Sequence, residues 1–172
     1  EGGAWIYHGT ATGVNSAPSF FAQSDQVDAL LGYSVATAGD VNGDGYADII
    51  VGARAYAAPT VSEGAAFVWH GSANGVNSGA NGTPANANWH AESNETSALL
   101  GIAVATAGDV NGDGYADVIV GAYQYGATDA GAALVWYSTS NGVNNDVAGT
   151  PANAAWKATG ASDEAHLGRS VA

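Results

Sequence analysis

Cysteine and methionine are both absent from this chain of 172 residues, and only 3 residues are lysine or arginine. Without cysteine there is no disulfide, no zinc–thiolate or iron–sulfur site and no cysteine nucleophile. The 16 acidic residues bring the formal net charge to −13, which argues against nucleic acid and against an anionic membrane surface as partners. Apolar runs are short and broken by glycine or polar residues, so no transmembrane helix is predicted.

Hydrophobic residues and glycine are plentiful. Hydrophobic residues make up 47% of the chain and charged residues 11%, a balance that allows a buried core and excludes a disordered acidic tail. The 25 glycines predict many turns. The length corresponds to one ordinary domain or two small ones.

An internal repeat dominates the sequence. The segment ATAGDVNGDGYADI at 36–49 returns as ATAGDVNGDGYADV at 105–118, which is 69 residues later. A Leu-Gly pair that precedes each copy occurs a third time at 167–168. Residues 1–9, 63–71 and 130–138 are further copies of one segment. Such a period indicates a repeat architecture.

Each repeat contains four short runs with strand character, separated by Gly, Asn, Asp and Pro. The runs in the first full repeat are Tyr33–Ala38, Asp48–Val51, Ala65–Trp69 and a run centred on Trp89. Asn74-Gly75 and Asn141-Gly142 favour tight hairpin turns. Since no helical periodicity of useful length is present, the sequence predicts an all-β fold. Four strands in each period are typical of a four-stranded antiparallel β-propeller blade.

The phase of the repeat predicts a partial propeller. Residues 1–29 would supply strands three and four of an incomplete blade, residues 30–97 and 98–164 would form two complete blades, and residues 165–172 would begin a further blade. A closed ring needs at least about four blades. We therefore expect further blades, either from a longer parent chain or from other copies of this chain.

The repeated acidic segment has the ligand spacing of a calcium loop. Oxygen-bearing side chains occupy positions 1, 3, 5 and 9, with a backbone carbonyl available at position 7. Ca²⁺ takes about six to eight oxygen ligands, and Gly45 and Gly114 let the backbone turn tightly around one ion. The predicted metal-binding residues are Asp40, Asn42, Asp44, Tyr46 and Asp48 in one copy, and Asp109, Asn111, Asp113, Tyr115 and Asp117 in the other. About two Ca²⁺ ions per chain are expected.

Two other interpretations of these loops were compared with this one. An EF-hand or dockerin loop closes with a carboxylate at its last position and leads into a helix, whereas Val51 and Val120 occupy that position here, within apolar strand-like runs. An ordinary Asx/Gly turn with solvated acids is the simpler alternative. Two nearly identical copies that keep all four oxygen-bearing positions favour the metal site.

These residues resemble the FG-GAP repeat of integrin α-subunit propellers and of many bacterial surface proteins. Leu31-Gly32 and Leu100-Gly101 correspond to the family's usual Phe-Gly, and residues 51–54 correspond to its Gly-Ala-Pro, without the proline. The resemblance covers nearly the whole chain, and it predicts a bacterial-type member of this family. It implies a blade whose first strand lies nearest the ring axis, with a structural Ca²⁺ in the loop between strands one and two.

Other polar and aromatic residues were interpreted as structural. The aromatic residues that recur once in each repeat predict packing between blades, with carbohydrate stacking as an alternative. His90 and His166, and the acids Glu92, Glu95, Asp163 and Glu164, were expected at the surface. Two Asn-X-Thr matches, at Asn81 and Asn94, carry little weight in a chain so rich in these residues.

The sequence favours a non-enzymatic function. It contains no nucleophile elbow, phosphate loop or histidine-rich metal triad. The leading hypothesis is an extracellular or cell-surface Ca²⁺-binding propeller segment that acts in adhesion or as a scaffold, because millimolar extracellular calcium would keep weak loops filled. The alternatives are a carbohydrate-binding propeller and an accessory region of a secreted hydrolase. Extracellular protein or glycan ligands are the expected partners.

Overall fold

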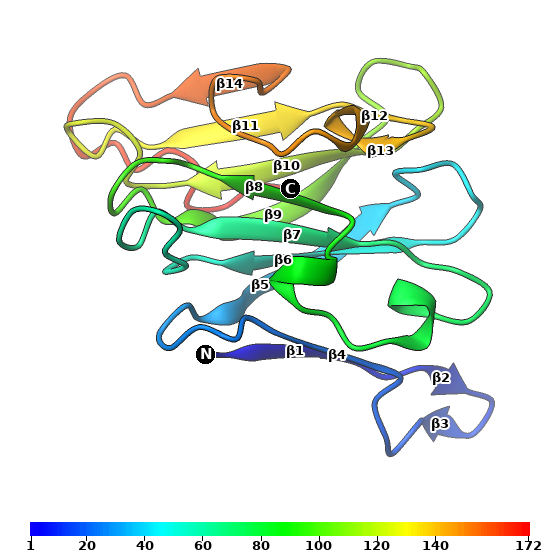
Figure 1. Cartoon of the computed structure of the whole chain (residues 1–172). Helices are drawn as coiled ribbons and strands as arrows, with labels where there is room; N and C mark the ends of the chain where they lie inside the picture. The colour runs from blue at the N-terminus through cyan, green and yellow to red at the C-terminus, as the bar shows by residue number, and fades with distance from the viewer.

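The computed structural model describes all 172 residues, which form β-strands and three short 3₁₀ helices (Figure 1). The strands are β1 (Gly3–Ile6), β2 (Gly9–Thr10), β3 (Gly13–Val14), β4 (Phe20–Gln23), β5 (Leu31–Gly39), β6 (Asp48–Ala53), β7 (Ala65–Trp69), β8 (Trp89–Glu92), β9 (Leu100–Gly108), β10 (Asp117–Ala122), β11 (Ala132–Trp136), β12 (Ser138–Thr139), β13 (Gly142–Val143) and β14 (Trp156–Thr159). The 3₁₀ helices are η1 (Val76–Gly79), η2 (Pro84–Asn86) and η3 (Asn144–Asp146). None of the helices has the length and apolar character needed to cross a membrane.

Two four-stranded antiparallel sheets form the body of the molecule. The first blade has the order β5-β6-β7-β8 and the second blade has the order β9-β10-β11-β14. Both central pairs keep the same register, since Ile50 lies opposite Val68 and Ile119 lies opposite Val135. Every residue of β7 is buried, because this strand is covered on both faces. The all-β fold of partial propeller blades is thus confirmed.

A pair of strands and three small elements complete the fold. β1 pairs with β4 antiparallel to form the N-terminal strand pair. The short hairpins β2–β3 and β12–β13 follow β1 and β11, at equivalent places in the repeat. The tight turn expected at Asn141-Gly142 joins β12 to β13. In the first blade the turn expected at Asn74-Gly75 is also present, since the N–H of Gly75 donates to Ser72 O at 2.9 Å and that of Asn77 donates to His70 O at 2.8 Å, but η1 follows it in place of a second short strand.

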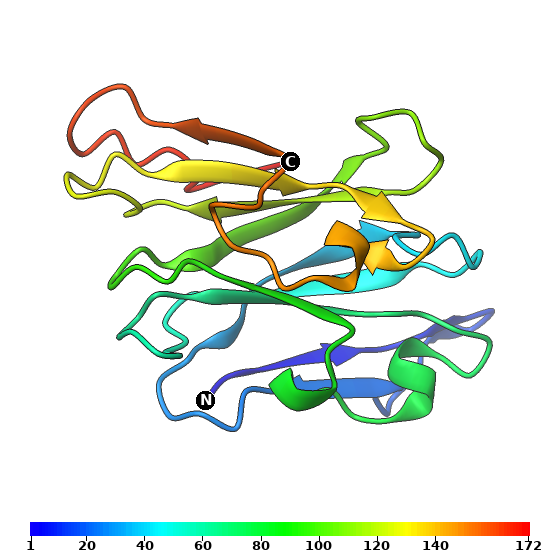
Figure 2. The same cartoon turned by 45° about the horizontal axis from the view of Figure 1, so that its top comes forward.

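Neighbouring sheets are stacked face to face and joined by backbone hydrogen bonds at both ends of their strands (Figures 1 and 2). Near one end, the N–H of Leu31 donates to Glu1 O, and that of Leu100 donates to Glu63 O, each at 3.0 Å. Leu167 repeats this contact with Ala130 O at 3.0 Å, although residues 165–172 form no strand. Residues 165–172 therefore begin at the same position relative to the preceding sheet as the first strand of each blade does.

The cores lie between the sheets. One buried cluster joins the first and second blades, and a smaller one joins the N-terminal strand pair to the first blade. Aromatic rings from strand four of one sheet meet rings from strand three of the next: Phe20 and Trp69 have centroids 5.9 Å apart, and Trp89 and Trp136 have centroids 5.4 Å apart. The recurring aromatics that lie between two sheets pack as predicted, because Phe20, Trp69, Trp89 and Trp136 are all buried. Tyr7 and Trp156, in the first and last sheets, are 47% and 51% exposed.

Close backbone approach between blades requires glycine at one strand position. A Cβ atom on Gly52 in β6 would collide with the carbonyl oxygen of Gly101 in β9, and Gly121 has the same relation to Gly168. Any side chain at Gly52 would therefore push the two blades apart.

Replacing Gly52 with alanine should destabilise the protein by about 1–3 kcal/mol, the usual effect of overpacking a core. Gly9→Ala is the matched control, because no atom lies within 4 Å of a Cβ placed there and its backbone needs no positive φ. Urea unfolding of both variants measures the difference. Equal stability of the two variants would contradict the packing argument.

Candidate metal centre

The two acidic segments are the loops that join strands one and two of each blade. Residues 40–47 connect β5 to β6 and residues 109–116 connect β9 to β10. The strand register closes each loop, since Gly39 lies opposite Asp48 and Gly108 lies opposite Asp117. Gly45 (φ 86°) and Gly114 (φ 95°) have the left-handed backbone that favours glycine, as predicted for loop position 6.

Asp40 organises the tip of the first loop through its own backbone. Its Oδ1 accepts hydrogen bonds from the N–H groups of Gly43 at 2.8 Å and Asp44 at 3.0 Å, and its Oδ2 accepts one from Gly45 at 2.8 Å. Asn42 Nδ2 donates to Asp44 Oδ2 at 3.1 Å, and Asp44 Oδ1 accepts from the N–H of Tyr46 at 2.9 Å. Four of the predicted ligand residues, Asp40, Asn42, Asp44 and Tyr46, are thus brought together in one compact turn.

Asp48 differs from the other loop acids because it is completely buried. Its Oδ2 accepts a hydrogen bond from the N–H of Val41 at 2.8 Å, and its Oδ1 accepts one from Gly71 at 2.7 Å. Gly71 follows β7, so this carboxylate joins the loop to the end of strand three. The sequence motif gives no sign of this second connection, which links residues far apart in the chain.

The second loop reproduces the first nearly atom for atom. Asp109 accepts hydrogen bonds from the N–H groups of residues 112, 113 and 114, at 2.7, 3.0 and 2.8 Å. Asn111 Nδ2 donates to Asp113 Oδ2 at 2.9 Å, and the N–H of Tyr115 donates to Asp113 Oδ1 at 3.0 Å. Asp117 is buried and accepts from the N–H groups of Val110 and Ser138 at 2.9 and 2.8 Å.

No lysine or arginine side chain balances the charge in either loop. All hydrogen bonds to the loop carboxylates come from backbone N–H groups or from an asparagine amide. Burial raises the pKa of Asp117, and the nearby charges of Asp113 and Asp109 raise it further. Burial also raises the pKa of Asp48, although its two backbone hydrogen bonds and the nearby His70 lower this pKa in part. The loops are therefore strongly negative, and a cation would relieve the repulsion between their carboxylates.

The donor chemistry fits a hard cation, although the side chains are turned toward the loop backbone. No three acidic or histidine side chains converge on one point in the structure. An ionised carboxylate has about four lone-pair sites, so an oxygen that accepts one or two N–H groups can still bind a metal ion. Oxygen ligands on a glycine-containing loop are the set that Ca²⁺ prefers. Ligation would require the loop side chains to turn toward a common point.

The two loops also contact each other, which the sequence did not reveal. The N–H of Ala116 donates to the carbonyl oxygen of Asp40 at 3.1 Å. The Tyr115 ring lies so close to Gly43 that a Cβ atom there would be 2.6 Å from its Cε1. Neighbouring loops therefore form a continuous surface at one end of the blades.

Comparison with known families places this geometry in context. The model of the family described as FG-GAP repeat matches residues 31–69 and 100–136, and each match contains one acidic loop with strands one to three of a blade. Residues 31–69 and 100–136 are therefore two FG-GAP repeats. The expectation drawn from Leu31-Gly32, Leu100-Gly101 and the acidic loops is thereby confirmed.

Several integrin α subunits are similar to these FG-GAP repeats. Integrin alpha-PS2 of Drosophila melanogaster is 34% identical over 132 residues, covering 74% of this chain and 9% of that protein. Integrin alpha pat-2 of Caenorhabditis briggsae is 42% identical over 97 residues, covering 56% of this chain and 7% of that protein. Integrin alpha-6 of Homo sapiens is 48% identical over 50 residues, covering 29% of this chain and 4% of that protein.

The chain thus spans less than a tenth of the length of these relatives. All three are animal proteins, so the expected bacterial type is not supported by these matches.

Four residues expected at the surface are half-buried in the structure, namely His90, Glu92, Glu95 and His166, whose Nδ1 lies 3.3 Å from Tyr123 O. Glu92 and His90 lie on β8 and are half-buried, rather than in a solvated loop. On this side of β8 they line a pocket together with Tyr56, from the loop after β6, and Phe67 of β7. Glu95, Asp163 and Glu164 do lie in loops, and the last two are exposed.

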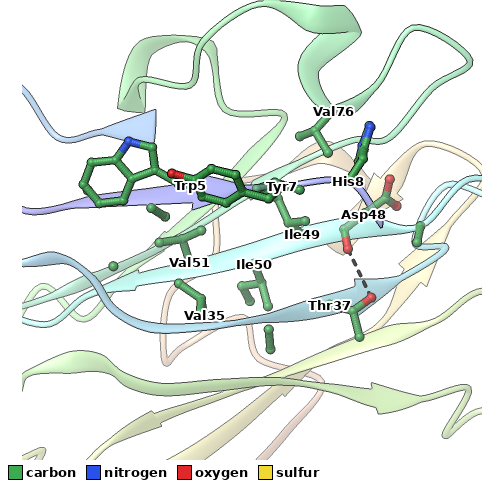
Figure 3. Close-up of a pocket in the computed structure, with 16 residues that line it drawn as sticks. Trp5, Tyr7, His8, Val35, Thr37, Asp48, Ile49, Ile50, Val51 and Val76 are labelled. Carbon is green, nitrogen blue, oxygen red and sulfur yellow. Dashed lines mark hydrogen bonds between the residues drawn. The ribbon is translucent and has the colours of Figure 1, made fainter. Parts of the chain in front are cut away.

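An apolar groove of about 720 Å³ lies between the N-terminal strand pair and the first blade. Figure 3 shows the Trp5 and Tyr7 rings along one side, above Val35, Ile49 and Val51 of the first blade. Trp5 is 55% exposed and Tyr7 is 47% exposed. The residues at the same repeat positions in the first blade, Phe67 and Trp69, are 1% and 0% exposed.

The buried carboxylate of Asp48 should stabilise the fold before any metal binds. In Asp48→Asn, an amide N–H₂ would face a backbone N–H donor, leaving a buried donor without an acceptor, so we expect a loss of about 1–3 kcal/mol in EDTA. Asp44→Asn, at an exposed position, is the control and should change stability by less than about 0.5 kcal/mol. Urea unfolding measures both variants, and a similar loss in each would refute the role given to Asp48.

Proposed function

We propose that this chain is a non-enzymatic, Ca²⁺-binding segment of an FG-GAP β-propeller that acts outside the cell, in adhesion or as a scaffold. The observation that carries the proposal is the pair of matched loops with clustered carboxylates that no lysine or arginine neutralises. The similarity to integrin α subunits supports the adhesion role.

The proposed ligands are the oxygen atoms of the two loops. Asp40, Asn42, Asp44 and Asp48 would hold one ion together with the Tyr46 carbonyl, and Asp109, Asn111, Asp113, Asp117 and the Tyr115 carbonyl would hold the second. Because each loop is joined to strand three through its buried aspartate, an ion would stiffen the whole end of a blade. Calcium is therefore proposed as a structural ion rather than a catalytic one.

Carbohydrate binding through the recurring aromatics receives no support from the geometry. The alternative required an aromatic face in each blade that a sugar can reach, but Trp69, Trp89 and Trp136 are 0%, 2% and 0% exposed. Their rings are already in contact with rings of neighbouring sheets. The only aromatics at the equivalent strand positions that are largely exposed are Tyr7 and Trp156, in the first and last sheets. We therefore favour the scaffold and adhesion interpretation.

Calcium titration by calorimetry should detect two sites per chain, and Ca²⁺ at 100 times its Kd should stabilise the fold by about 2.7 kcal/mol per site. Asp109→Ala should remove one site and leave the other, since the first loop has its own complete ligand set. The absence of both binding heat and a change in Tm on chelation would refute the calcium proposal.

We further propose that the apolar groove beside Trp5 is covered by strands one and two of an FG-GAP blade in the working assembly. The internal interface provides the comparison: Val104 in β9 is 7% exposed because the first blade covers it, whereas its counterpart Val35 in β5 is 60% exposed. On the face toward the preceding sheet, β9 packs against β5, β6 and β7. On the same face, β5 packs against the N-terminal strand pair mainly through β1.

Adding such a hairpin should bury the groove. A copy of residues 98–129 placed directly before Glu1 restores the repeat spacing, because Glu1 corresponds to Ala130. In a Trp156→Phe background Trp5 is the one largely exposed tryptophan, and its quenching by iodide should fall to that of the buried tryptophans.

The control extension carries aspartate at the copy of Ile119, whose counterpart Ile50 is buried against the second blade. This control should leave Trp5 accessible to iodide. Unchanged quenching with the unmodified extension would refute the proposed cover.

A further inference from the structure

A second pocket, of about 330 Å³, lies on the first blade away from the acidic loops. It is lined by residues of β7, β8, η2 and the loop after β6, namely Tyr56, Phe67, Pro84, Ala85, His90 and Glu92. Two of its walls are aromatic: Tyr56 meets Phe67 edge-on, with centroids 5.4 Å apart. The imidazole of His90 lies 6.4 Å from the Phe67 ring.

Two carboxylates make this region negative. Glu92 lines the pocket, and Glu63 is completely buried close by. Glu63 Oε1 accepts hydrogen bonds from the N–H groups of Ala58 at 2.6 Å and Thr60 at 3.2 Å, but its Oε2 is buried without a partner. Burial and the Glu63 charge raise the pKa of Glu92, which places these two carboxyl groups near each other.

The chain supplies no basic side chain to balance these acids. Arg54 lies over the Tyr33 ring, 4.5 Å from its centroid. Lys157 lies on the second blade, and Arg169 is in the last segment of the chain. Burial lowers the pKa of His90, so its imidazole is neutral at neutral pH and contributes no positive charge.

The second blade shows what occupies the corresponding position there. Tyr125 corresponds to Tyr56, and Lys157 corresponds to His90. The Lys157 ammonium lies over the Tyr125 ring, 5.6 Å from its centroid. In that blade Ala130 and Thr159 replace Glu63 and Glu92. The second blade therefore has an ammonium group over the tyrosine ring and lacks the two acids. The first blade has the tyrosine ring and the two acids but lacks the ammonium group.

We propose that the pocket of the first blade binds the primary ammonium group of a ligand, such as a lysine side chain on a partner protein, between the Glu92 carboxylate and the Tyr56 ring. Aromatic faces and a carboxylate attract an organic ammonium group. A divalent metal ion would require about six oxygen ligands, and this pocket offers few oxygen donors beyond Glu92 and the Tyr56 hydroxyl. This proposal is independent of calcium in the loops.

The probe is n-butylammonium, with n-butanol as its neutral counterpart of the same shape. Titration at neutral pH in EDTA, followed by NMR on the His90 and Tyr56 ring protons, should show saturable binding of the amine and much weaker binding of the alcohol. Glu92→Gln should weaken amine binding by at least about tenfold, since a hydrogen bond to a charged group is lost. Asp163→Asn, which removes an exposed acid elsewhere, should leave the affinity unchanged. Equal binding of amine and alcohol, or an unaffected Glu92→Gln variant, would overturn the proposal.

A second pair of variants supplies the ammonium group from within the chain. His90→Lys places a lysine where the second blade has Lys157, so it should raise Tm and prevent binding of n-butylammonium. His90→Gln removes the imidazole without adding an amine and should still bind the probe. Circular dichroism confirms that both variants are folded. If both bind n-butylammonium equally well, the pocket does not select an ammonium group and the proposal fails.

Discussion

The structure depends on one constraint: a blade with two apolar faces can bury them only between two neighbouring sheets. β7 is buried along its whole length because the N-terminal strand pair covers one face and the second blade covers the other. Where that cover is incomplete, equivalent residues become exposed, as Val35 does in comparison with Val104. Glycine at Gly52 and Gly121 allows the backbones to approach closely enough for this packing. Blade contacts, groove and aromatic pairs all follow from the same requirement.

Strands and acidic loops could be predicted from the sequence because both depend on local patterns repeated at one spacing. The predicted runs at 48–51 and 65–69 lie within β6 and β7, and both loops have the expected glycine conformation. The hydrogen bond from Gly71 to Asp48 could not be predicted, because it joins residues brought together only by the pairing of β6 with β7. The same holds for the burial of Glu92 and His90, which depends on the fold of the loop after β6.

The buried aspartates have two roles, because they hold the strand ends together and are also proposed metal ligands. Asp48 and Asp117 each accept two backbone hydrogen bonds, so the fold needs these carboxylates even without an ion. Their neighbours Asp44 and Asp113 are exposed and accept hydrogen bonds only from within the loop tip. A buried acid at the base of the loop and exposed acids at its tip would allow the proposed ion to bind without unfolding the strand ends.

The outer strands differ most between repeats, because they are least constrained by packing between sheets. Position 90 is histidine in the first blade, lysine at 157 in the second and phenylalanine at 21 in the N-terminal strand pair. By contrast, the aromatic residue just before it is kept at 20, 89 and 156, since its side chain points toward the next sheet. The identity of residues that face the next blade is therefore constrained by packing, whereas residues on the other side of strand four can differ from one repeat to the next. Differences in ligand binding among blades are expected on that side, where Glu92 replaces a threonine and carries its charge into a pocket with aromatic walls.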